Sequence, residues 1–392
     1  MKEFIILMAS LTAMVALSID AMLPALQIMG ADLHVMRAND MQYVISFIFI
    51  GMAIGQVVYG PLADHLGRKP TLFIGLGLFI GGCLLSYMAT SLPLMLLGRF
   101  IQGLGVASPR IMTMAIVRDK YEGREMARVM SMVMGVFIMV PAIAPSLGQV
   151  IMHLWGWRAI FMFYILAAVM AFLWAAVRLE ETLTPKHHRP FNLRTILSGF
   201  KEAAMNRATM GYTACGGLIF GAMLGYLNSS QQIFQEIYQA GDMFAVYFGV
   251  LAVCIGAAFF CNSALVRRLG MRNITRHALH ALVICSCIFL AYTLIAPVPL
   301  LVFMLVMGVT FFCLGLMFGN MTALALEPMG HMAGLASAFN GAVSSVISLL
   351  LGMLIGQEFG GTLLPLAVGF VALSIATWLL MRWVEKPTRH PS

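Results

Sequence analysis

Long apolar stretches dominate this sequence and limit what it can fold into. Each stretch is long enough to cross a bilayer as a helix, which needs about 20 residues. A spanning backbone must satisfy its own hydrogen bonds, and these runs lack the two-residue alternation of membrane β-strands. We therefore predict an all-α membrane protein with twelve transmembrane helices, in the runs 4–29, 41–62, 71–90, 94–117, 129–151, 159–177, 208–230, 243–264, 278–296, 299–325, 332–356 and 362–381.

The composition excludes a soluble fold, because 61% of the 392 residues are hydrophobic and only 10% are charged. A soluble domain carries about 25% charged residues. The first run is too long for a signal peptide and has no small-residue cleavage site after it, so we expect it to be retained. All seven cysteines lie inside apolar runs without disulfide or metal-ligand spacing, and we interpret them as packing residues.

Basic residues are distributed unequally between the loops. The net charge of +8 could indicate nucleic acid, but the lysines and arginines sit in short loops between apolar runs, so we expect no nucleic-acid partner. If the N-terminus is cytoplasmic, the cytoplasmic side holds 20 of the 24, against only Arg37 and Arg158 outside. Cytoplasmic loops carry the positive excess in membrane proteins, so both termini are predicted to be cytoplasmic.

The longest polar stretch separates two halves of equal helix number. We predict an N-terminal six-helix bundle at 1–178, a cytoplasmic linker loop at 179–207 and a C-terminal six-helix bundle at 208–392. An arginine-rich loop at 64–70 is echoed by one at 265–276, which indicates two pseudo-symmetric bundles related by an axis normal to the membrane.

Three charged residues lie inside the predicted spans: Asp20, Arg99 and Arg110. A charge at the centre of a span costs roughly 2.5 to 3.5 kcal/mol, so such groups usually face the bundle interior and mark a transport path. The eleven residues between the two arginines return them to within about 20° of one helix face. We expect the three residues to couple transport to protons, with Asp20 as the group that titrates.

Two alternatives stay open for these charges. Asp20 and Arg99 could form a fixed ion pair that only locks the first and fourth spans together. Arg110 could favour an anionic or zwitterionic cargo, since the three charges sum to +1, or it could extend from its span toward the cytoplasm.

The loop after the second span carries a specific pattern. Residues 60–69 read GPLADHLGRK, with Gly60 and Gly67 at turns and Asp64 at a helix end. An acid there opposes the helix dipole, so it should have a cationic partner or the N-terminus of another helix nearby. Arg118, near the cytoplasmic end of the fourth span, is a candidate for this partner. The segment resembles the loop signature of the major facilitator superfamily, G-x-L-x-D-x-x-G-R-[K/R].

Further motifs narrow this resemblance to twelve-span drug:proton antiporters of the bicyclomycin-resistance (Bcr/CflA) type. Residues 99–105 read RFIQGLG, similar to the R-x-x-Q-G-x-G motif that the family links to proton transfer. Pro141 and Pro145 in the fifth span resemble its antiporter motif. The remaining similar stretches are DAMLPAL at 20–26, GWRAIF at 156–161, ETL at 181–183 and GLASA at 334–338.

The resemblance implies proton-driven efflux from the cytoplasm by alternating access, in the inner membrane of a bacterium. We expect a multi-pass monomer that contacts protons, lipid and a small-molecule substrate, and that uses the proton gradient in place of a cofactor. The residues expected at the substrate are Asp20, Gln102, Arg110, Met139, Tyr226, Asn228, Phe311, Asn320 and Asn340. Those expected to gate the conformational change are Gly60, Asp64, Gly67, Arg68, Arg118, Pro141 and Pro145.

Other functions stay open at this point. The chain could instead be a dedicated exporter of one anionic or zwitterionic metabolite, such as a carboxylate siderophore or an amino acid. A proton-coupled importer ranks behind both. We expect no enzyme, because the sequence shows no catalytic constellation, metal cluster or phosphate-binding loop.

Overall fold

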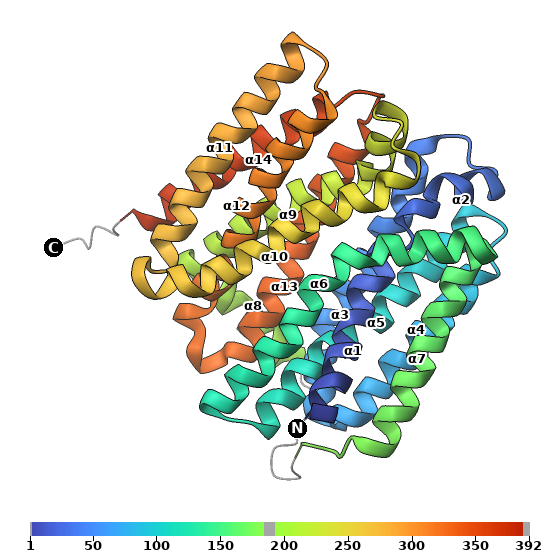
Figure 1. Ribbon diagram of the computed structural model, residues 1–392. Helices are drawn as coiled ribbons and strands as arrows, with labels where there is room; N and C mark the ends of the chain where they lie inside the picture. Colours follow the sequence, from blue (N-terminus) through green and yellow to red (C-terminus); the bar gives the residue numbers. More distant parts are fainter. Residues whose placement is uncertain (1, 184–192, 387–392) are drawn as a thin grey trace. The chain divides into compact units, whose positions relative to one another are not determined.

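A computed structural model describes residues 2–183 and 193–386, and these residues are helical almost throughout, with no strand among them (Figure 1). The helices are α1 (Lys2–Asp20), α2 (Leu26–Asp32), α3 (Tyr43–Leu66), α4 (Arg68–Tyr87), α5 (Leu92–Lys120), α6 (Gly123–Trp155), α7 (Arg158–Arg178), α8 (Leu193–Met205), α9 (Arg207–Gln232), α10 (Phe244–Leu269), α11 (Met271–Ile295), α12 (Leu300–Leu326), α13 (Ala333–Gln357) and α14 (Leu364–Glu385).

The described helices account for the predicted spans. Eleven segments are long and apolar enough to cross a membrane, and one of them, Leu300–Gln357, has 58 residues and contains both α12 and α13. The described residues therefore hold twelve apolar helices of the length and composition that cross a membrane, and the predicted all-α class is confirmed. The placement of both termini on the cytoplasmic side stays a prediction.

The chain forms two compact units. Unit 1 comprises residues 1–192 and 230–252, and unit 2 comprises residues 193–229 and 253–392. Unit 1 thus includes the last residues of α9, the turn Ile233–Ile237 and the start of α10. The predicted bundle boundaries stay a prediction.

The first span is not one continuous helix, contrary to the expectation for 4–29. Helix α1 ends at Asp20, a single 3-10 turn follows at Leu23–Ala25, and α2 then begins. Pro24 explains the interruption, because it has no backbone N–H and its ring clashes with the preceding helical turn. The break places Asp20 at the last residue of α1.

The predicted linker loop contains a helix. Helix α8 lies within 179–207, while residues 184–192 of that loop lie outside the described residues. It packs on α13 in unit 2, where the rings of Phe200 and Phe339 meet edge to face at 5.5 Å and His331 lies 2.7 Å from Glu202. The segment contains charged residues and so forms no long apolar run, which is why the sequence did not predict this amphipathic helix.

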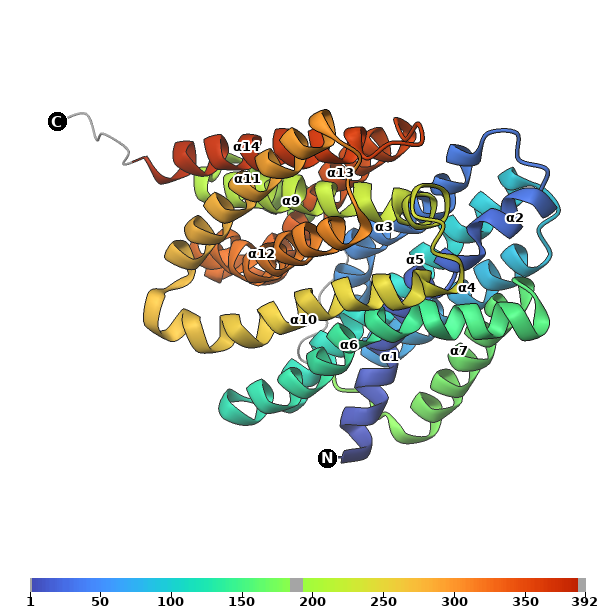
Figure 2. The ribbon, with the colours of Figure 1, turned by 45° about the horizontal axis from the view of Figure 1, so that its top comes forward.

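Helix α5 is the most tightly packed element of unit 1, and it lies with α3 and α4 in both views (Figures 1 and 2). Glycines make this approach possible on two faces. A Cβ atom on Gly103 would overlap the carbonyl oxygen of Ile48 in α3, and one on Gly105 would overlap the backbone of Phe79 in α4. Small residues at such contacts let helix backbones pack closely, which is a main source of helix association in lipid.

Two adjacent glycines of α4 test this packing. A Cβ on Gly82 would overlap the backbone of Gln102 in α5, whereas one on Gly81 would meet nothing within 4 Å. We expect Gly82→Ala to lower the free energy of unfolding by about 1 to 3 kcal/mol, as overpacking does. Gly81→Ala should leave it unchanged or raise it by up to about 1 kcal/mol, through better helix propensity. Thermal unfolding in detergent measures both, and equal melting temperatures for the two variants would contradict the packing argument.

Candidate functional site

Asp20 lies at the break of the first span and is only 6% exposed. The next residue, Ala21, is pressed against α6, because a Cβ added to Gly148 would overlap the Ala21 carbonyl oxygen. None of the hydrogen bonds or ion pairs of the described residues involves the Asp20 carboxylate. The acid is therefore buried in unit 1 without a charged partner.

Arg99 of α5 is completely buried and uses its donors on neutral groups. Its Nε donates to the carbonyl oxygen of Val44 in α3 at 3.1 Å, and its Nη2 donates to that of Ser18 in α1 at 2.9 Å. Its Nη1 donates to Oε1 of Gln102 at 2.7 Å. The guanidinium thus joins α1 and α3 to α5.

The ion pair between Asp20 and Arg99 that the sequence left open is absent from the described residues. Arg99 binds the carbonyl oxygen of Ser18, two residues before Asp20, instead of the carboxylate. The break after Asp20 offers a physical reason, since the last carbonyl groups of a helix have no partner within it and accept from outside donors.

Arg110 follows on the same continuous helix, as the sequence predicted for the two arginines. Its side chain is exposed, although its neighbours Ser108, Pro109 and Met112 are buried. No ion pair of the described residues involves Arg110. Arg110 is therefore an accessible cation without an ion-pair partner among the described residues, on the helix that also holds Arg99.

Met139, the other substrate residue predicted in unit 1, lies on α6 and is 60% exposed. Helix α6 runs through both Pro141 and Pro145 without interruption and ends at Trp155, directly before Gly156, whose φ is +80°. The gating role of the two prolines stays a prediction.

Predicted substrate residues of unit 2 form separate contacts. Tyr226 and Phe311 meet edge to face with ring centroids 4.8 Å apart, which joins α9 to α12. Asn228 donates to the carbonyl oxygen of Gly352 at 3.1 Å. Asn320 donates to Asn262 at 2.7 Å, and Asn340 accepts from Thr213 at 2.9 Å. Their part in binding a substrate stays a prediction.

A chain of buried amides in unit 1 escaped the sequence analysis. Gln42 donates to Gln232 at 2.6 Å, and Gln232 donates to Asn39 at 2.8 Å. Gln42 and Gln232 are 3% and 6% exposed. The turn Ile233–Ile237 that follows is a π-helix, an irregularity often found at functional sites. These amides carry no charge and lie near the ends of apolar runs, so a search for charged residues within the spans does not select them. The irregular helical spacing at Ile233–Ile237, directly after Gln232, is the feature that could have indicated them.

The loop between α3 and α4 contains an ion-pair network, with one partner different from the prediction. Arg68 lies 2.6 Å from Asp64 and 2.9 Å from Asp119 at the end of α5. The expected partner of Asp64, Arg118, is exposed, and no described ion pair includes it. Asp64 thus has a cationic partner, but this partner is Arg68 and not the candidate Arg118, because the turn at Gly67 brings Arg68 back onto Asp64, four residues before it.

Glu181 closes the same loop from the segment after α7. Its carboxylate accepts from the backbone N–H groups of Arg68 at 2.9 Å and Lys69 at 3.0 Å, the first two residues of α4. Gly67 has φ +104°, and a Cβ there would lie 2.6 Å from Oε2 of Glu181. Glycine is thus required at position 67 for two reasons: the backbone conformation, and the space that the Glu181 carboxylate occupies. The ETL motif therefore caps α4, while Gly60 has nothing within 4 Å of an added Cβ.

Glu181 makes this cap sensitive to pH. Partial burial raises the pKa of the carboxyl, but hydrogen bonds from Leu183, Arg68, Lys69 and Thr182 outweigh it and hold the pKa below its ordinary value. A carboxyl with a lowered pKa stabilises the fold at neutral pH, and this contribution is lost as the pH falls through the pKa of the folded state.

We expect Glu181→Gln to lower stability at pH 7 by about 0.5 kcal/mol, since the carboxylate is partly exposed to solvent. The variant should lose less of its stability than the wild type between pH 7 and pH 4. Thermal melts at the two pH values measure the difference. Glu180→Gln, an exposed neighbour, is the matched control and should follow the wild type; an identical pH response in both variants would exclude the cap.

The twelve apolar helices and the charges buried among them define a class of protein, the polytopic membrane transporters. Residues 8–352 match the family model of the Major Facilitator Superfamily, and the chain belongs to this superfamily. It is therefore a multi-pass membrane transporter, and not an enzyme.

Curated relatives and solved structures agree with this assignment. The chain is 28% identical to a bicyclomycin resistance protein homolog of Haemophilus influenzae, over 93% of this chain and 91% of that protein. It is 27% identical to the multidrug resistance protein MdtL of Escherichia coli, over 98% and 96%. The structure of the xylose transporter XylE from E. coli shares the fold, with a TM-score of 0.74, 13% identity and coverage of 100% and 99%. The resemblance to bicyclomycin-resistance transporters is thereby confirmed.

Proposed function

We propose that the protein exports small molecules from the cytoplasm in exchange for protons, by alternating access, in the inner membrane of a bacterium. Relatives named for bicyclomycin resistance and multidrug resistance, each matching more than nine tenths of the chain, support export as the direction. The proton gradient drives the cycle, and no cofactor takes part. A polyspecific drug pump is the first candidate within this function.

The isolation of Asp20 is the observation that carries proton coupling. A charged carboxylate in a span is costly, and no ion pair of the described residues compensates this one. Taking up a proton removes the charge, and releasing it restores the charge. Arg99 cannot supply this step, because an arginine stays protonated in proteins and its donors here are bound to carbonyl groups.

The helix break gives Asp20 a route to affect structure. Asp20 ends α1, and the turn after it lies against α6 at Gly148. A change of charge at this point acts on two helices of unit 1, α1 and α6. We infer that proton uptake and cargo release alternate at this junction.

Asp20→Asn tests the proposal. We expect the variant to fold and to bind cargo but to lose transport driven by a pH gradient, by at least about tenfold, since the amide cannot exchange a proton. Proteoliposomes with an imposed pH gradient measure the rate. Glu122→Gln, an exposed acid before α6, is the control and should transport like the wild type. Undiminished gradient-driven transport by Asp20→Asn would refute the coupling role.

Arg110 favours the alternative of a dedicated exporter for an anionic or zwitterionic metabolite. Its side chain is exposed and forms no ion pair among the described residues, whereas Nε, Nη1 and Nη2 of Arg99 each donate a hydrogen bond. An accessible cation attracts an anionic cargo and repels a lipophilic cation.

We expect Arg110→Gln to reduce transport of carboxylate substrates about tenfold while leaving that of neutral drugs within about twofold, and Arg110→Lys to retain most of both. Competition assays in proteoliposomes with one anionic, one neutral and one cationic compound separate the cases. Equal loss for all three compounds would indicate a structural role for Arg110.

A further inference from the structure

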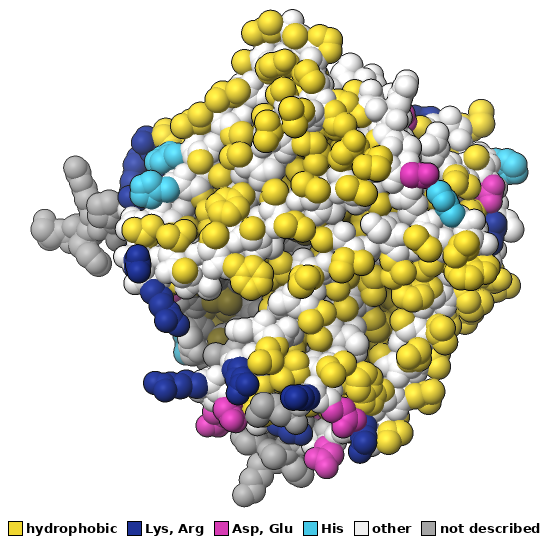
Figure 3. Space-filling model, in the orientation of Figure 1, with side chains coloured by type: hydrophobic (Ala, Val, Ile, Leu, Met, Phe, Trp, Pro, Cys, Tyr) yellow, Lys and Arg dark blue, Asp and Glu magenta, His cyan; other side chains and the backbone are white. Residues whose placement is uncertain are grey.

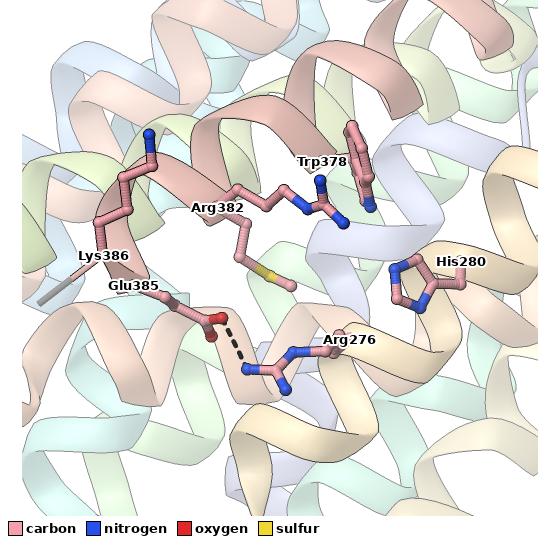
Figure 4. A pocket seen from close by; sticks show the side chains of 7 residues that line it. Arg276, His280, Trp378, Arg382, Glu385 and Lys386 are labelled. Atoms are coloured by element: carbon pink, nitrogen blue, oxygen red, sulfur yellow. Dashed lines mark hydrogen bonds and ion pairs between the residues drawn. The ribbon is translucent and has the colours of Figure 1, made fainter.

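A cavity of about 400 Å³ lies between the ends of α11 and α14 in unit 2 (Figure 4). The two helices pack side by side in both ribbon views (Figures 1 and 2). The volume of the cavity falls in the range of small-ligand pockets, roughly 300 to 1,000 Å³. It is lined by Arg276 and His280 from α11 and by Trp378, Met381, Arg382, Glu385 and Lys386 at the end of α14.

The one acid of the cavity is already neutralised. Glu385 accepts from Nη2 of Arg276 at 2.8 Å and from the hydroxyl of Tyr212 at 3.2 Å. The ion pair with Arg276 is the dashed line in Figure 4. The charge of Glu385 is therefore already compensated by Arg276, without a second cation from the cavity wall.

Two cations remain without a carboxylate. The guanidinium of Arg382 lies 3.8 Å from the ring centroid of Trp378 and beside that ring in Figure 4. No ion pair of the described residues includes Arg382 or Lys386, and both side chains are exposed. A guanidinium oriented by an aromatic ring presents its N–H groups in the plane of the fork, which matches a phosphate. The wall of the cavity thus carries a surplus positive charge.

The surface next to this charge is apolar and exposed. Ile284 lies one helical turn beyond His280 on α11 and is 61% exposed, and Ile288 is 58% exposed. On α14, Leu379 is 56% exposed and Trp383 is 50% exposed. Figure 3 shows Lys, Arg and His side chains at the edge of a surface that carries many apolar side chains. In a transmembrane protein such side chains contact lipid tails, and tryptophan favours the level of the headgroups.

From this arrangement we infer that the cavity binds the headgroup of an anionic phospholipid. The phosphodiester lies at Arg382 and Lys386, with His280 opposite, and the acyl chains lie along the exposed faces of α11 and α14. Basic pockets between transmembrane helices bind anionic headgroups in this manner. A free phosphate would use the cations but not the apolar faces, so the continuity of the two favours a lipid.

Native mass spectrometry of the full-length protein in detergent tests the inference. The probes are phosphatidylglycerol and phosphatidylcholine with identical acyl chains, together with sn-glycerol 3-phosphate as the water-soluble counterpart. We expect the wild type to retain phosphatidylglycerol in preference to phosphatidylcholine. Glycerol phosphate at the same concentration should not displace the lipid.

Charge-neutralising variants locate the binding. Arg382→Gln should weaken phosphatidylglycerol binding about fivefold, since one cation near an anionic lipid contributes about 1 kcal/mol. Lys386→Gln should act in the same direction and lies beyond the last helical residue of α14, so it gives a second reading if Arg382→Gln misfolds. Arg268→Gln, an exposed arginine near the end of α10 and outside the cavity, is the control and should bind like the wild type.

Three results would overturn the inference. Equal retention of the two lipids would exclude a site for anionic headgroups. Equal weakening by Arg268→Gln and Arg382→Gln would mean that only the general positive charge attracts the lipid. Displacement of phosphatidylglycerol by glycerol phosphate would assign the cavity to a soluble phosphate compound.

Discussion

Close backbone contact around α5 is the constraint on which unit 1 depends. Lipid tails are as apolar as leucine, so burying apolar side chains gives transmembrane helices little reason to associate. Glycines on opposite faces of α5 allow α3 and α4 to approach at van der Waals distance, and buried Arg99 joins α1 and α3 to the same helix through backbone carbonyl groups. The position of every proposed coupling residue in unit 1 follows from this packing.

Hydropathy and loop charge predicted the helices well, because a bilayer imposes a length and a polarity on each span. Two features did not follow from such averages. Pro24 interrupts the first span within a stretch of high mean hydropathy, and an averaging window does not detect the interruption. Helix α8 lies in a charged segment, and its apolar face is defined by contact with α13, a partner that local sequence does not reveal.

The candidate site was likewise only partly predictable from the sequence. Residue type and position along a span were enough to single out Asp20, Arg99 and Arg110. The partners were not predictable, because they depend on which groups of other helices come within reach. Arg99 binds carbonyl oxygens in place of Asp20, and Asp64 pairs with Arg68 in place of Arg118, through a turn that only the conformation of Gly67 explains.

Because the partners of Arg99 are neutral, the contacts that it makes between helices do not depend on the charge of Asp20. An arginine held by a carboxylate loses its strongest contact whenever that carboxylate takes up a proton. Carbonyl oxygens do not titrate, so the hydrogen bonds from Arg99 to Val44 and Ser18 keep their acceptors whether or not Asp20 carries a proton. Under the proposed coupling, the hydrogen bonds that join α1 and α3 to α5 would therefore persist through repeated changes of charge, and the structural response would begin at the break after Asp20 and at its contact with α6.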